Sequence, residues 1–145
     1  MANLDNLLKV EKHKVDEKQK VLARLFREQE ELIAARQSVY DTIEKEGQLA
    51  ATNFSDISVQ QSFASFKKGA KLKIATLTDK ISRLEIRIAI AQEEVRAAFA
   101  EFKKIEIVDR NRKEKERKAR QKKEDETFDE IGINIHRRTH SDDSQ

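Results

Sequence analysis

Two histidines near the end of the chain have the spacing best suited to metal chemistry. His136 and His140 are four residues apart, as zinc-binding histidines on a helix are. However, the chain has no cysteine, and no set of acidic ligands near the pair completes a site. The surrounding residues are polar and without periodicity, which predicts a disordered tail. We therefore expect no metal site and no cofactor.

The sequence also lacks the usual signatures of catalysis. The three glycines, Gly47, Gly69 and Gly132, are isolated, so none belongs to a phosphate-binding loop. Without cysteine there is no thiolate chemistry. The many acidic side chains fit the polar faces of amphipathic helices, and two paired helices offer no concave pocket that excludes water. We expect a protein that is not an enzyme.

The densest charge lies in residues 109–127, where fifteen of nineteen residues are charged, nine basic and six acidic. Good helix formers fill this segment, so it predicts a single charged helix that binds a partner. A solvated helix without a partner is the alternative. Interleaved acids and the lack of aromatics disfavour a nucleic-acid arm. The candidate binding residues are Arg110, Arg112, Lys113, Arg117, Lys118 and Arg120, and we expect none of them to lie opposite the first helix. Pairs four residues apart, Glu114 with Lys118 and Asp109 with Lys113, are expected to support this helix.

A second candidate surface is apolar. Phe26, Ile33 and Tyr40 recur every seven residues, one position past a heptad seam, and Phe66 lies on the other flank of the second helix. The flank either widens the seam or docks another protein.

Two heptad ladders must position these residues. Steps of three and four from Leu4 to Ala50 meet apolar residues at nine of fourteen positions, and steps from Phe63 to Ile105 at twelve of thirteen. Asn3 fits an N-cap for the first helix, and Ser58 with Gln61 fits a capping box for the second.

The two ladders match when the chain folds back on itself. If Ala50 faces Phe63, facing residue numbers sum to 113, and Glu46 meets Lys67 with opposite charge. The apolar ladder of the second helix stops near Asp109, where the first helix runs out. The prediction is an all-α fold, a long two-helix antiparallel coiled-coil hairpin with a charged single-helix overhang on helix 2. Its parts are helix 1 at about 3–50, a loop at about 51–60, helix 2 at about 61–131, and a disordered tail at 133–145.

Composition supports this fold. There is no proline, charged residues make up 39% of the chain and aromatics 6%, as in long helices and coiled coils. The first ten residues carry no signal-peptide core, and no apolar run approaches the ~20 residues that span a bilayer. The net charge is only +3, which gives no reason to expect nucleic acid. We expect a cytoplasmic protein that is a monomer on its own.

The sequence resembles the FliJ family of flagellar type III export proteins over residues 3–132. The similarity rests on residues 7–11 with Asp16 and Glu17, on an aromatic pair after the turn, and on the run KKEDETFDEI at 122–131. The aromatic pair is Phe63 and Phe66, followed by Leu77 and Ile81.

The resemblance implies a coiled-coil stalk that enters a hexameric export ATPase, contacts the export gate membrane protein and binds export chaperones. It implies a cytoplasmic protein held peripherally at the inner-membrane export apparatus through its partners. A stalk protein of an injectisome shares this architecture. A coiled-coil scaffold or holdase chaperone is a further alternative, although residues 51–62 are short and polar for a prefoldin-like chain.

Overall fold

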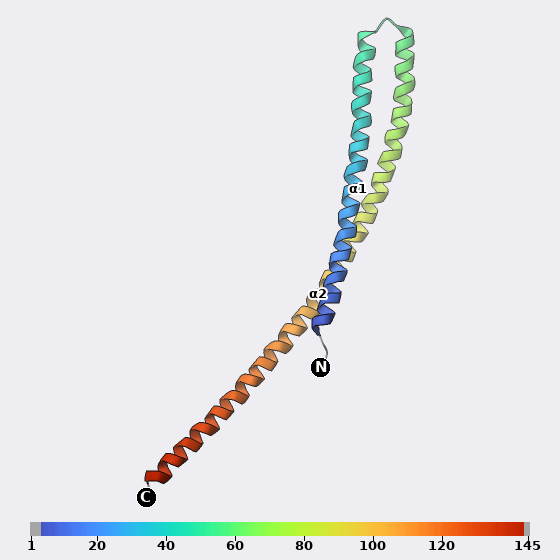
Figure 1. The fold of residues 1–145 in the computed structure, drawn as a ribbon. Helices are drawn as coiled ribbons and strands as arrows, with labels where there is room; N and C mark the ends of the chain where they lie inside the picture. Colours follow the sequence, from blue (N-terminus) through green and yellow to red (C-terminus); the bar gives the residue numbers. More distant parts are fainter. Residues whose placement is uncertain (1–3, 144–145) are drawn as a thin grey trace. The chain divides into compact units, whose positions relative to one another are not determined.

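The computed structural model describes residues 4–143, which form two helices, α1 (Leu4–Thr52) and α2 (Ile57–Asp143). Figure 1 shows both as continuous helices joined by a short turn. Proline is absent, and the three glycines lie inside helices, where each lowers helix stability by about 0.5–1 kcal/mol relative to alanine without breaking the helix. The all-α two-helix prediction is confirmed.

The chain divides into two compact units. One is Glu11–Ala100, which holds most of α1, the turn and the first half of α2. The other combines Met1–Val10 with Glu101–Gln145.

The unit Glu11–Ala100 is an antiparallel coiled coil with the predicted seam. A core forms around Leu25, Leu84, Ile88 and Ala91, with Val21, Leu22 and Leu32 packed against it. All its buried residues fall on the two predicted ladders: Val15, Leu25, Ala50, Ala70, Leu77, Ile81, Leu84, Ile88 and Ala91.

Polar contacts across the seam agree with the predicted register. Lys18 Nζ lies 3.1 Å from Glu94 Oε2, and Arg36 Nη1 donates to Thr78 Oγ1 at 3.3 Å. Each pair of residue numbers sums to within one of 113. Glu46 and Lys67, which we expected to pair, are both exposed, and no ion pair joins them in the described residues. Apolar packing therefore carries the register without that charge pair.

The turn is shorter than predicted, because α1 extends to Thr52 and α2 begins at Ile57. Asp56, not Ser58, caps α2: its Oδ1 accepts from the backbone N–H groups of Ser58 at 3.0 Å and Val59 at 3.3 Å. Gln60 caps the other helix, since its Nε2 donates to the carbonyl of Ala50 at 2.7 Å. The earlier start of α2 therefore follows from the cap at Asp56, two residues before the predicted one.

In the unit formed by Met1–Val10 and Glu101–Gln145, the start of α1 lies against α2. Leu4, Leu8, Phe102 and Ile105 are half-buried, as the ladder predicts. Asp109, where the apolar ladder ends, is buried and only 6% exposed. Asn3, the predicted N-cap, lies outside the described residues.

The last part of α2 differs from the prediction. The helix does not end at 131 but continues to Asp143, so residues 133–143 are helical instead of disordered; 144–145 lie outside the described residues. Gly132 has open space around it and a helical backbone, and it is too weak a breaker to stop the helix. Residues 113–142 are all exposed.

Candidate partner-binding surfaces

The six predicted basic residues do not share one face of α2. At 100° per residue, Arg110, Lys113, Arg117 and Arg120 fall on one side of the helix. They line a shallow depression together with Glu106, Asp109 and Glu114. Arg112 and Lys118 point away from it by their helical positions. The structure therefore brings four of the six together.

Acids of the same helix partly neutralise this basic face. Arg117 Nη2 lies 2.8 Å from Glu114 Oε1, and Arg110 Nη2 lies 3.4 Å from Glu106 Oε1. The hydrogen bond between Arg117 and Glu114 raises the pKa of Arg117 and lowers the pKa of Glu114. Glu114, predicted to pair with Lys118, pairs with Arg117 instead. These exposed pairs are weak and are screened by salt, so a partner's acids could replace them.

Lys113 has a structural role that we did not expect. Its Nζ lies 3.0 Å from Asp109 Oδ2 and 3.3 Å from Asp5 Oδ1 of α1. The hydrogen bonds to Asp109 first and Asp5 second raise its pKa. We expected none of the six to lie opposite the first helix, which is wrong for Lys113 and for Arg112, a half-buried residue at a seam position.

The predicted apolar flank is half-exposed. Phe26, Ile33 and Tyr40 of α1 expose 39%, 42% and 48% of their surface. These fractions leave apolar area free in the hairpin. Phe66 is exposed to 39% but lies on the other flank, so the structure does not bring it together with the other three.

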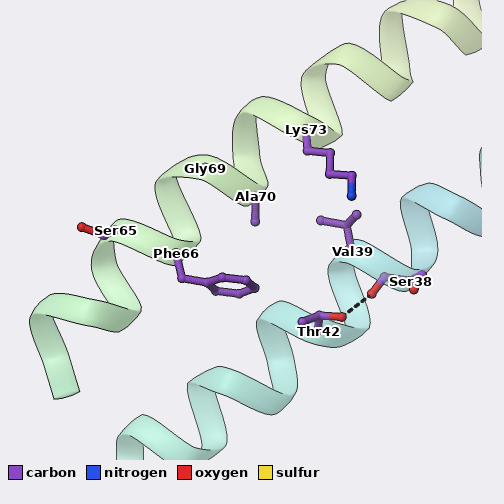
Figure 2. Close-up of a pocket in the computed structure, with 8 residues that line it drawn as sticks. All are labelled: Ser38, Val39, Thr42, Ser65, Phe66, Gly69, Ala70 and Lys73. Carbon is purple, nitrogen blue, oxygen red and sulfur yellow. Dashed lines mark hydrogen bonds between the residues drawn. The ribbon is translucent and has the colours of Figure 1, made fainter.

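Phe66 lines a groove between the helices that sequence reasoning missed. The groove has a volume of about 430 Å³ and is lined by Ser38, Val39, Thr42, Ser65, Phe66, Gly69, Ala70 and Lys73. Figure 2 shows the Phe66 ring and Val39 facing the space between α1 and α2. Thr42 turns its hydroxyl to the carbonyl of Ser38 at 2.8 Å, so that hydroxyl is already satisfied.

Small side chains create the groove. Ser65, Gly69 and Ala70 leave room on α2, and a Cβ at Gly69 would meet no atom within 4 Å. The sequence did contain a sign of the groove, namely small residues at helical spacing on both facing helices. They went unnoticed because small residues do not interrupt a heptad ladder.

Four lysines lie in the groove's segment of α2. Residues 57–78 contain Lys67, Lys68, Lys71 and Lys73 and no acidic residue. In the described structure none of the four forms an ion pair. Of the four, Lys73 lines the groove itself.

Neither a metal cluster nor a membrane span is evident in the residues that the structure describes. Between residues 4 and 143 no three His, Asp or Glu side chains gather closely enough to hold an ion. Within that same range neither helix has a stretch long and apolar enough to cross a bilayer.

Comparison with known proteins identifies the family of the chain. A family model described as "Flagellar FliJ protein" matches residues 1–141. Neither a curated protein nor a solved structure matches the chain. The match covers both helices, and the family is a non-enzymatic component of flagellar export. The chain belongs to the FliJ family of flagellar proteins.

Proposed function

We propose that this protein is a non-catalytic coiled-coil stalk that engages the ring of the flagellar export ATPase, the export gate and export chaperones. In this role it supports type III secretion of flagellar subunits from the cytoplasmic side of the inner membrane. The observation that carries the proposal is the exposed basic face of α2, on a helical segment without a partner helix: residues 113–142 are exposed throughout.

Electrostatics explains how this face would bind. Arg110 and Arg117 pair only with acids one turn away on the same helix, at 3.4 and 2.8 Å. Exchanging these pairs for acidic loops of a ring needs no refolding of α2. Binding of this kind is fast and sensitive to salt. The same argument does not extend to Lys113, because moving it would strip the buried Asp109 of its cation.

The apolar surfaces are proposed for the gate and the chaperones. The groove at Phe66 offers an apolar floor beside Lys73, which suits a partner helix that carries a large apolar side chain next to an acid. The flank of Phe26, Ile33 and Tyr40 offers a second, separate stripe.

The test of the ATPase role changes only basic residues that do not hold α1. Replacing Arg110, Arg117 and Arg120 of the basic face with alanine, together with the nearby Lys118 that lies off this face, should abolish stimulation of the purified export ATPase. Binding to the ring should weaken by on the order of tenfold or more, because each exposed ion contact contributes about 0.2–1 kcal/mol. Stimulation by the unaltered protein should fall as salt rises.

A matched control removes four exposed basic residues of α2 within the hairpin, Lys80, Arg83, Arg87 and Arg96. This variant should stimulate the ATPase like the unaltered protein. If both variants fail alike, net charge and not the basic face is responsible. If the first variant stimulates normally, the proposed stalk contact is wrong.

A further inference from the structure

His136 and His140 lie on the helical part of α2 that we had expected to be disordered. The helix extends to Asp143, so the two side chains are one turn apart on one side. Their ring centroids are 4.3 Å apart and the rings are tilted by 41°. The disorder that argued against a metal site is therefore absent at both histidines.

This geometry suits chelation by two imidazoles. Zinc binds imidazole nitrogen at about 2.0–2.1 Å in a tetrahedral site, which places two ligand nitrogens about 3.3 Å apart. The ring centroids are 4.3 Å apart, so both imidazoles come within reach of one ion when the rings rotate to aim a nitrogen of each at it. Both residues are exposed, so an ion can approach without opening the structure.

The neighbouring charges leave the site accessible to a cation. Arg137 and Arg138 are adjacent in sequence, but their helical positions are about 80–180° away from the histidine side of α2. Asp129 lies on the histidine side two turns earlier, too far to bind the same ion. No third protein ligand is available in the described residues, so water or another molecule would complete the coordination.

We propose that His136 and His140 form a bidentate site for a divalent late transition-metal ion, with Zn²⁺ as the physiological candidate. The ion would join two successive turns near the end of α2 and stabilise the helix there. Isolated helices are marginal in water and fray at their ends, and residues 113–142 have no packing partner. The proposal concerns only this chain and does not rest on the ATPase contact.

Titration with Zn²⁺ alone, followed by calorimetry and by amide hydrogen exchange, tests the site. One ion should bind per chain and slow exchange of the amides near residues 132–143. His136→Ala and His140→Ala should each weaken binding by at least about tenfold, since even an outer-shell partner of a metal site is worth about 10–100-fold. Cu²⁺ should bind more tightly than Zn²⁺, following the general order for nitrogen ligands.

The chain offers two controls. His13→Ala removes the one histidine outside the pair and should leave binding unchanged. His140→Ser combined with Ser141→His keeps three histidines but moves one to a spacing of five, about 140° away on the helix, and should lose the tight site. Equal binding by the spacing variant, loss of binding in His13→Ala, or no slowing of exchange near 132–143 would each overturn the proposal.

Discussion

Lys113 joins α1 to a buried acid, and it also lies on the basic face that we propose binds a partner. Its Nζ contacts Asp109, which is buried, and Asp5, which is exposed, at 3.0 and 3.3 Å. A buried carboxylate that loses its cation is costly, whereas an exposed acid that loses one is returned to water. The two acids that contact Lys113 therefore differ in importance.

We predict that Lys113→Ala releases the start of α1, and that Asp5→Asn has a smaller effect, within about 0.5 kcal/mol as for most surface changes. Lys115 is an exposed lysine two residues later, so Lys115→Ala should leave the start of α1 unchanged. Hydrogen exchange of the amides in residues 4–10 measures the release. Equal exchange in the lysine variants at 113 and 115 would show that the ion pairs do not hold α1.

The pH dependence follows from the raised pKa of Lys113. A cation whose pKa is higher in the folded state stabilises that state fully below its ordinary pKa of 10.5, and the stabilisation is lost as pH rises through the folded-state value. The start of α1 should therefore loosen only above about pH 10.5, and the Lys113→Ala variant should lack this alkaline step.

At the scale of the helices, the hairpin was predictable because apolar residues recur at a fixed spacing along both α1 and α2. Leu25 and Ile88 fall where the constant sum of 113 places them, and both are buried. Cap choice was not predictable with the same certainty, since Asp56 and Ser58 are both good caps and tertiary geometry decides between them. The groove at Gly69 was not predicted, because the heptad pattern identifies large apolar residues and gives no information on where side-chain volume is lacking.

The parts of α2 should also differ in stability. Residues 113–142 are exposed and depend on local pairs such as Arg117 with Glu114, which contribute about 0.2–0.5 kcal/mol each. We predict that their amides exchange much faster than those of the hairpin, and faster still in 1 M salt, which screens the pairs. Hydrogen exchange resolved along the chain measures this.

The substitution Leu25→Ala tests whether the hairpin and residues 113–142 unfold independently. Leu25 is only 3% exposed, so its truncation should destabilise the hairpin by about 2–5 kcal/mol. Exchange in residues 113–142 should not change, because those residues are exposed and belong to the other compact unit. A uniform increase along the whole of α2 would instead mean that the helix unfolds as one cooperative element.

At the scale of the whole molecule, different faces of the two helices carry different chemistry, as the proposal of several partners requires. The basic face of α2 is charged, the groove at Phe66 is apolar beside Lys73, and the flank of Phe26, Ile33 and Tyr40 is apolar. None of these residues lines more than one of the three surfaces. Substitutions on one surface should therefore spare the functions of the others.

Tyr40→Ala and Phe66→Ala test this separation on the two apolar surfaces. We predict that each weakens binding to a different partner, the purified cytoplasmic domain of the export gate or an export chaperone, by about tenfold, the loss typical of an aromatic anchor. Neither should change stimulation of the export ATPase. Both side chains are about half exposed, so helicity by circular dichroism should stay constant. Parallel loss of binding to both partners together with lost helicity would mean that the aromatics only support the hairpin. Unchanged binding in both variants would mean that the two surfaces face water.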